Sequence, residues 1–279
     1  MFADLHVHTT SSYGDTTPSQ VAEVANQKGL SAVSITDHDR INSLFDGQRV
    51  IHSDGVELIS GIELCVEVEA IGESVDLLGY GVMPSDELQE MTEWISENRV
   101  YRAKEMIRKI ESELDIKLDI KLHDSIGRPH IARAVSEHPS VDISYEEVFA
   151  VYIGEGCPCY VGRCKPTFSK GISILRDDCV TVGLAHPFRY DDPIQCGAYM
   201  IDKVDFFELQ YPYGGTLNEK TDTLRRLLGI EGCHSGGSDA YTTDDIGQCG
   251  LTESEYMEFM QETGLVDYST GSVISEQAV

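Results

Sequence analysis

Residues 2–8 read Phe-Ala-Asp-Leu-His-Val-His, an apolar run that carries Asp4, His6 and His8 at every second position. In a β-strand, side chains two residues apart point to the same face, so these three polar groups would share one side. Two imidazoles placed this way can bind one cation, but a His-x-His pair alone is equally typical of polar residues near a sheet edge. The stretch therefore predicts a strand that carries a candidate metal site.

Apolar runs of this kind recur along the chain and alternate with segments of helical spacing, which is typical of β/α units. A helix is predicted after the first run, with Thr17 as its cap, Pro18 at its first position and Gly29 at its end. Another is predicted over 217–228, closed by Gly229. The seven runs expected to form strands are 2–7, 30–35, 56–62, 75–80, 180–185, 204–209 and 230–235.

The middle of the chain breaks this rhythm, because residues 85–165 show helical periodicity and no strong strand candidate. We expect one or two amphipathic helices at its start. The predicted organisation is a barrel domain formed by residues 1–84 and 166–279, interrupted by a helical insert domain at 85–165. The shorter helices expected in and after the insert are 131–136, 145–152 and 253–262.

The composition limits the possible function classes. The 279 residues include 21 basic and 48 acidic side chains, a net charge of −27 at pH 7, which excludes a generic nucleic-acid-coating surface. Hydrophobic residues make up 41% of the chain, enough for a large core rather than wholesale disorder. The eight cysteines are scattered, and we find neither a secretion signal nor an apolar stretch of membrane-spanning length. We expect a cytoplasmic protein with free thiols and no membrane partner.

Residues able to bind a metal ion end or follow most of the predicted strands. Where parallel strands form a barrel, their carboxyl ends converge on one mouth, so these side chains are expected to meet there. Buried carboxylates and imidazoles are costly unless compensated, and a divalent cation is a natural compensation. These residues are Asp4, His6, His8, Asp37, His38, Asp39, Glu63, Asp76, His186 and Asp239.

Five ordered motifs among these residues resemble the PHP (polymerase and histidinol phosphatase) superfamily of metal-dependent phosphoesterases. They are Asp-x-His-x-His at 4–8, Thr-Asp-His at 36–38, Gly-x-Glu at 61–63, Ala-His-Pro at 185–187 and Gly-Ser-Asp at 237–239. The resemblance implies an α/β fold, a distorted seven-stranded (β/α)7 TIM-like barrel with a small helical insert domain. Within the insert, residues 127–134 (Gly-Arg-Pro-His-Ile-Ala-Arg-Ala) resemble the motif of the subgroup that removes phosphate from nucleoside phosphates.

The resemblance also implies the ligands of two divalent ions, with Mn, Fe or Zn as candidates. Relatives usually have histidine at the position of Asp76, and aspartate is a harder but competent ligand. The implied ligands are His6, His8, Glu63 and Asp239 for the first ion, and Glu63, His186 and Asp76 for the second.

A third ion is bound in relatives by an aspartate, the histidine of Thr-Asp-His and a histidine two residues after the Gly-Ser-Asp motif. This chain has Tyr13 and Tyr241 at the first and last of these positions, which leaves only His38. Neutral phenols are poor ligands for hard divalent ions, since their pKa is near 10. We therefore expect two bound ions, unless a third site is rebuilt around Asp15 or Asp39.

The implied reaction is hydrolysis of phosphate monoesters of small nucleotides, such as a nucleoside 3′,5′-bisphosphate or AMP, by attack of a metal-bound hydroxide. His38 or Asp37 would transfer the proton, and Arg128 and His130 of the insert would hold the phosphate. A 5′-to-3′ exonuclease side activity fits the resemblance, but the acidic surface offers no track for RNA, so no stable nucleic-acid complex is expected. The alternatives are a degenerate PHP module that only binds, and a histidinol phosphatase, whose relatives generally lack the insert motif.

Overall fold

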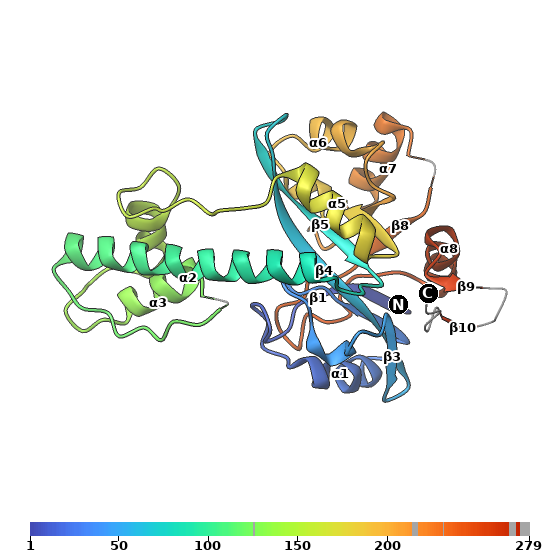
Figure 1. Cartoon of the computed structure of the whole chain (residues 1–279), viewed down its shortest axis with the longest axis horizontal. Helices are drawn as coiled ribbons and strands as arrows, with labels where there is room; N and C mark the ends of the chain where they lie inside the picture. The colour runs from blue at the N-terminus through green and yellow to red at the C-terminus, as the bar shows by residue number, and fades with distance from the viewer. Residues whose placement is uncertain (125, 214–216, 231, 268–271, 274–279) are drawn as a thin grey trace. The chain divides into compact units, whose positions relative to one another are not determined.

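The computed structural model describes residues 1–124, 126–213, 217–230, 232–267 and 272–273. It has an α/β fold built on a mixed sheet (Figure 1). The strands are β1 Ala3–Val7, β2 Ala32–Ile35, β3 Val50–Ser53, β4 Val56–Val68, β5 Glu73–Tyr80, β6 Thr181–Leu184, β7 Phe206–Gln210 and β8 His234–Gly236, with a separate pair, β9 Val266–Asp267 and β10 Ser272–Val273.

All seven predicted runs contain or overlap a strand of the main sheet, although residue 231 of the last run lies outside the described residues. Three strands were not predicted, namely β3, β9 and β10. They are only two to four residues long, and such short segments carry little periodicity. The α/β class predicted from the sequence is therefore confirmed.

Neighbouring strands follow the order β1-β2-β4-β5-β6-β7-β8, and β3 pairs with β4. The pairs at both ends of this order are parallel, whereas β5 runs antiparallel to both β4 and β6. The expectation of parallel strands throughout is thus wrong for β5. Because β5 is reversed, its first half lies beside the second half of β4, with Asp76 opposite Cys65. This reversal brings Asp76 to the edge where the parallel strands end.

Backbone hydrogen bonds join the carboxyl end of β1 to the turn that follows β8, the last strand of this order. His8 N donates to Ala240 O at 2.9 Å, and Ala240 N donates to His6 O at 3.3 Å. These bonds place the turn after β8 beside β1. A closed seven-stranded barrel stays a prediction.

The helices include both of the capped helices that the sequence predicts. α1 follows a 3-10 turn at Pro18–Gln20 and ends before Gly29, whose φ is +78°, and α7 ends before Gly229, whose φ is +64°. None of the described helices has the length and apolar character needed to cross a membrane. The helices are α1 Val21–Gln27, α2 Asp86–Leu114, α3 Arg128–Ser136, α4 Tyr145–Glu147, α5 Phe168–Asp178, α6 Pro193–Met200, α7 Leu217–Leu228 and α8 Glu253–Thr263.

Contacts divide the chain into two compact units, residues 1–89 with 166–279, and residues 90–165. In the first unit, α1 packs on β2 and β4, α5 packs on β4 and β6, α6 packs on α7, and α8 packs on β8. The apolar side chains between these layers are fully buried, as Leu5, Ile59 and Phe259 illustrate. This packing supports the ends of the strands from which the polar residues project.

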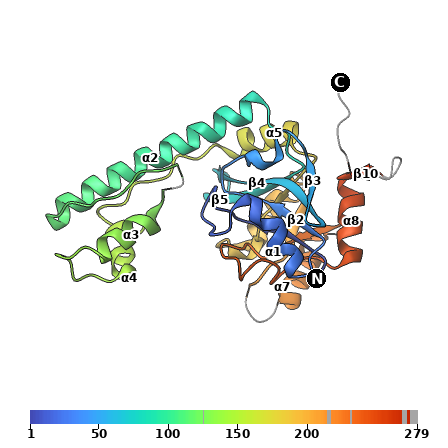
Figure 2. The same cartoon turned by 90° about the horizontal axis from the view of Figure 1, so that it is seen from below.

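The second unit has an apolar core of its own, formed by the carboxyl-terminal part of α2 with α3, α4 and a π-helical turn at Val148–Ile153. Figure 2 shows α3 and α4 beside this part of α2. Met106 and Ile110 of α2 pack with Ile131 and Val135 of α3 in this core. The amphipathic start of the predicted insert is one continuous helix of 29 residues rather than two. The domain boundaries at residues 84/85 and 165/166 stay a prediction.

Candidate metal centre

The candidate centre begins at β1, where His6 and His8 are 0% and 1% exposed and their rings lie 5.1 Å apart. Asp4, on the same strand, binds backbone N–H groups. Its carboxylate accepts hydrogen bonds from the backbone of Ser238 at 2.9 Å and of Gly247 at 2.8 Å. Asp4 therefore ties the Gly-Ser-Asp turn to β1.

Glu63 of β4 lies among four imidazoles and is fully buried. Its Oε1 is 3.4 Å from His6 Nε2 and 2.9 Å from His186 Nε2. Its Oε2 is 3.3 Å from His8 Nε2 and 2.7 Å from His38 Nδ1. One carboxylate thus contacts side chains from β1, from the loop after β2 and from the loop after β6.

Asp239 approaches the same place from the turn after β8. Its Oδ1 is 2.9 Å from His8 Nε2 and 3.5 Å from His6 Nε2. Gly237 allows this approach, because a Cβ at that position would lie 2.3 Å from the Cβ of His6. Ligand atoms of these four residues lie within 4.8 Å of one another, and we call them the β1 group: His6, His8, Glu63 and Asp239.

Donors from β5 and from the end of β6 adjoin the β1 group. Asp76 Oδ2 lies 3.8 Å from His186 Nε2, and ligand atoms of His38, Glu63 and Asp76 also lie within 4.8 Å of one another. His186 has a φ of +27°, a strained conformation that persists only where its surroundings enforce it. We call Glu63, Asp76 and His186 the β5 group. All six predicted ligands are therefore close together.

Charge in this cluster is set by burial and by opposite charges. Burial opposes a charge on His6, but the carboxylates of Glu208, Glu63 and Asp239 raise its pKa well above its ordinary value. Burial likewise opposes a charge on His8, but hydrogen bonds with Asp239 and Glu63 raise its pKa to about 9. Against its own burial, Glu63 has its pKa held well below the usual range by His38 and His6. The carboxylates of Glu63 and Asp239 thus stabilise positive charge in the space between them and the histidines.

The buried Nε2 of His6 faces Glu63 and Asp239 and has no hydrogen-bond partner among the described residues. Buried polar atoms in proteins are normally paired, so each exception needs a reason. Imidazole nitrogens and carboxylate oxygens together suit Zn²⁺, Mn²⁺ and Fe²⁺. The donor set therefore fits divalent cations.

His38 lies at the rim of the cluster, with 18% of its side chain exposed. Its Nε2 is 3.0 Å from the hydroxyl of Tyr241, and the edge of Tyr13 approaches its ring at 5.6 Å. Tyr241 also stacks on His8, with ring centroids 4.6 Å apart. The two tyrosines that replace the expected third-ion ligands thus lie beside the one ligand that is left.

Asp37 is fully buried and its carboxylate accepts four hydrogen bonds. They come from the backbone N of Thr9 at 2.8 Å, Thr9 Oγ1 at 2.7 Å, Ser12 Oγ at 2.6 Å and Asn42 Nδ2 at 2.9 Å. These bonds tie the loop after β1 to the loop after β2.

Three residues of the site were not assigned a role from the sequence, and one of them, Glu208, was missed altogether. Glu208 of β7 lies 2.9 Å from His6 Nδ1, and its signal was a single carboxylate inside an apolar run. Arg189 donates to Asp239 Oδ2 at 2.9 Å and to the hydroxyl of Tyr211 at 2.9 Å. Arg189 follows the Ala-His-Pro motif and Tyr211 follows a predicted strand, so the sequence allows both at the mouth, but it favours a solvated charge and a wall residue.

Arg128 and His130 belong to α3 in the second unit, where each has a local contact. His130 Nδ1 accepts the backbone N–H of Gly127 at 3.0 Å, which caps the start of α3. The guanidinium of Arg128 lies 5.7 Å from the ring centroid of Phe149. That these residues hold a phosphate stays a prediction.

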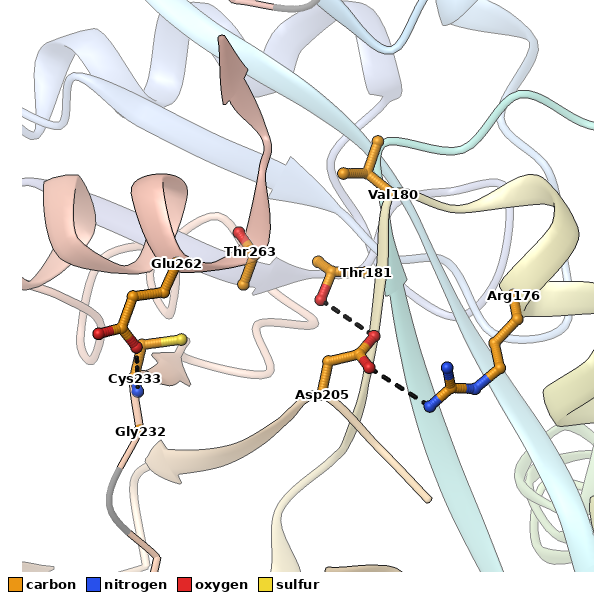
Figure 3. A pocket seen from close by; sticks show the side chains of 8 residues that line it. All are labelled: Arg176, Val180, Thr181, Asp205, Gly232, Cys233, Glu262 and Thr263. Carbon is orange, nitrogen blue, oxygen red and sulfur yellow. Dashed lines mark hydrogen bonds and ion pairs between the residues drawn. The ribbon is translucent and has the colours of Figure 1, made fainter. Parts of the chain in front are cut away.

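A cavity of about 420 Å³ in the first unit lies away from the predicted residues (Figure 3). Thr181 at the start of β6, Asp205 just before β7 and Cys233 just before β8 line it, so it lies at the opposite ends of the strands. Its cation is Arg176, which is paired with Asp205 at 3.3 Å. The cavity has no feature of the candidate metal centre.

Comparison with known proteins gives a match to the PHP domain over residues 4–138. The chain is 27% identical over 195 residues to a 3′,5′-nucleoside bisphosphate phosphatase of Chromobacterium violaceum, covering 67% of each chain. It is 26% identical over 216 residues to a phosphoribosyl 1,2-cyclic phosphate 1,2-diphosphodiesterase of Eggerthella lenta, covering 73% of this chain and 82% of the relative. It is 26% identical over 200 residues to the 5′-3′ exoribonuclease Rnm of Escherichia coli, covering 67% and 66%.

A solved structure from Bifidobacterium adolescentis superposes with a TM-score of 0.72 at 22% identity, covering 97% of this chain and 98% of that one. The likeness includes residues of both units, and at this identity it shows the fold alone.

Proposed function

Because residues 4–138 match the PHP domain, we propose that this chain is a metal-dependent phosphoesterase that hydrolyses phosphate monoesters of small nucleotides, such as a nucleoside 3′,5′-bisphosphate or AMP. The observation that carries the proposal is the β1 group, four buried residues with ligand atoms within 4.8 Å of one another. A module that only bound a partner would have no physical need to keep so many desolvated ligands together. The name of the nucleoside bisphosphate phosphatase relative points to the same substrate class.

The β1 group and the β5 group would each hold one divalent cation, Mn, Fe or Zn. Glu63 is common to both groups and has imidazoles at both of its oxygens, so it would be a ligand in each group. Bound divalent cations lower the pKa of water and offset the charge of phosphoryl oxygens. This local positive charge matters in a chain of net charge −27, which repels a phosphate ester at long range.

His38 is the better candidate for proton transfer. It is partly exposed and lies at the rim of the cluster, where a leaving group can be reached. Asp37 is buried and already accepts four hydrogen bonds, so its contacts favour a positioning role over the proton transfer considered from the sequence.

Arg189 provides a cation beside the proposed metal ligands, with about half of its side chain exposed. Its Nη1 is used by Asp239 and Tyr211, while Nε and Nη2 lie on the same planar fork that binds phosphate oxygens in pairs. We assign Arg189 to the substrate phosphate. The same role for Arg128 and His130 of the second unit stays a separate prediction from the sequence.

The test is a substrate panel with Mn²⁺: p-nitrophenyl phosphate, adenosine 3′,5′-bisphosphate, AMP, histidinol phosphate, a cyclic phosphate diester and a short 5′-phosphorylated RNA. We expect the small nucleotides to be hydrolysed fastest, His8→Ala to lower the rate at least 100-fold, and His52→Ala, at an exposed histidine of β3, to leave it unchanged. A strong preference for histidinol phosphate, the diester or RNA would overturn the substrate class. A protein that binds cations and hydrolyses none of the panel would support the binding-module alternative.

A further inference from the structure

Glu208 is a buried carboxylate outside the two groups assigned above to the cations. It lies in β7 between Phe207 and Leu209, and it is 0% exposed. A carboxylate inside an apolar strand is costly unless its oxygens are hydrogen-bonded. Its partners therefore indicate what it does.

The two oxygens of Glu208 contact residues of different groups. Oε1 lies 2.9 Å from Nδ1 of His6, which belongs to the β1 group. Oε2 accepts the backbone N–H of His186, which belongs to the β5 group, at 2.8 Å. The carboxylate of Glu208 thus contacts one proposed ligand of the β1 group and one of the β5 group.

The contact with His6 determines which ring nitrogen faces the β1 group. With Nδ1 directed at Glu208, Nε2 is directed at Glu63, 3.4 Å away, and at Asp239, 3.5 Å away. Nε2 is buried and has no hydrogen-bond partner among the described residues. A histidine that binds a metal in a protein almost always donates its other N–H to a carboxylate, a carbonyl or water. The His6–Glu208 pair has this arrangement.

The contact with His186 acts through the backbone. His186 has a φ of +27°, which needs a partner to hold it, and the N–H of this residue is the group that Glu208 accepts. The ring of the same residue reaches Glu63 Oε1 at 2.9 Å. The position of the His186 ring therefore depends on the same carboxylate as the orientation of His6.

We propose that Glu208 is a positioning residue that couples the two cation sites by orienting His6 for one and the backbone of His186 for the other. The inference rests on the proposed function for the assignment of the ligands. Removal of the Glu208 carboxylate is expected to weaken cation binding about 10- to 100-fold, the usual effect of removing a carboxylate that is hydrogen-bonded to a metal-binding histidine.

Glu208→Gln is the sharpest test, because it keeps the shape of the side chain. Both oxygens of Glu208 accept hydrogen bonds, so a glutamine can accept from only one of the two histidines and turns its NH₂ group toward the other. Asp178→Asn is the matched control. It changes another buried carboxylate of the same unit, one that accepts from Ser85 N at 2.9 Å and Ser85 Oγ at 2.8 Å.

Metal-free wild type and both variants are titrated with MnCl₂ by calorimetry, and their thermal unfolding is compared without metal. We expect Glu208→Gln to bind Mn²⁺ at least tenfold more weakly and Asp178→Asn to stay within twofold of wild type. In the zinc-loaded wild type, ¹⁵N NMR is expected to show the His6 proton on Nδ1, with a changed signal in Glu208→Gln. If the glutamine variant does not fold, Glu208→Asp, which keeps the charge, is titrated in its place with the same expectation of weaker binding.

Binding of Mn²⁺ by Glu208→Gln as tight as in wild type, or an equal loss in Asp178→Asn, would overturn the inference. The proposed function fails separately. A wild type that binds cations but hydrolyses no phosphate ester defeats the phosphoesterase and leaves the role of Glu208 intact, whereas an active wild type with an unaffected glutamine variant defeats the role of Glu208 alone.

Discussion

The hydroxyl of Tyr241 lies 3.0 Å from Nε2 of His38. Burial raises the pKa of Tyr241 above its ordinary value, and the negative charges of Glu63 and Asp239 raise it further, so the phenol stays neutral at physiological pH. A neutral phenol is a poor ligand for a hard cation, and here it contacts a ring nitrogen of His38, the one ligand left at the third position. The Tyr241–His38 contact therefore favours the proposal of two cations over three.

Changing the two tyrosines to ligands is expected to raise the number of cations bound. Wild type should bind two equivalents of Mn²⁺, and the double variant Tyr13→Asp, Tyr241→His should bind a third, because the change supplies a carboxylate and an imidazole next to His38. Calorimetric titration of the metal-free proteins gives the stoichiometry. Three equivalents in the wild type would contradict the two-cation account.

Replacing Arg189 tests its assignment to the substrate. A hydrogen bond to a charged group contributes roughly 1.5–3 kcal/mol, so Arg189→Ala should raise KM for a nucleotide about 10- to 100-fold. Arg189→Lys should be intermediate, because a lysine lacks the planar fork. Metal content should not change, since Asp239 keeps its contact with His8. An unchanged KM would exclude Arg189 from the substrate site.

Cation binding should release protons and tighten as the pH rises. The pKa of His8 is raised to about 9, so its ring is protonated at pH 7 in the metal-free protein, and the raised pKa of His6 favours the charged form of that ring as well. A cation binds only the neutral imidazole, so these protons must leave. Mn²⁺ affinity should therefore increase from pH 6.5 to about 9. Calorimetry in buffers of different ionisation enthalpy counts the protons, and a count of zero at pH 7 would be inconsistent with these pKa shifts.

The same shift gives a stability prediction for the metal-free protein. Because the folded-state pKa of His8 lies above its unfolded value of 6.5, its charge stabilises the fold fully below pH 6.5, and this contribution is lost as the pH rises through about 9. The thermal midpoint should fall over this window in the wild type and fall less in His8→Gln. Equal slopes would show that the charge of His8 does not contribute.

Asp37→Asn separates a positioning role from an acid–base role. The amide cannot accept all four hydrogen bonds, and an unsatisfied buried donor costs about 1–3 kcal/mol, so urea unfolding should show a loss of at least this size. The pH–rate profile should keep its shape, whereas His38→Asn should remove one limb of it. If the pH–rate profile of Asp37→Asn loses a limb, Asp37 rather than His38 transfers the proton.

Much of the fold could be predicted from the sequence, because apolar runs, caps and terminal glycines are local signals. The helix closed by Gly229 was predicted with its bounds, and the first helix was predicted between Thr17 and Gly29. The direction of β5 was not, because the pairing of a strand depends on contacts distant in sequence. The short strand β3 was missed since Val50–Ser53 is too short to show a period.

The candidate site was accessible from the sequence where residues fall into motifs. His6, His8 and Asp239 belong to such motifs, and the structure brings them together. Glu208 acts through partners about 20 to 200 residues away, so no local pattern marks it. Arg189 follows the Ala-His-Pro motif, but its partner Asp239 is 50 residues away, so the pair could not be predicted. Asp37 lies in a motif, so the sequence marks it as a site residue. Its carboxylate accepts four hydrogen bonds, three of them from residues distant in sequence, and these could not be predicted.

The most direct test of the central claim is elemental analysis of the purified protein combined with Mn²⁺ titration of the metal-free form, for wild type and His8→Ala side by side. The account predicts about two divalent cations bound per wild-type chain and a large loss in the variant, with His52→Ala unchanged. A wild type that binds no divalent cation stoichiometrically would contradict it.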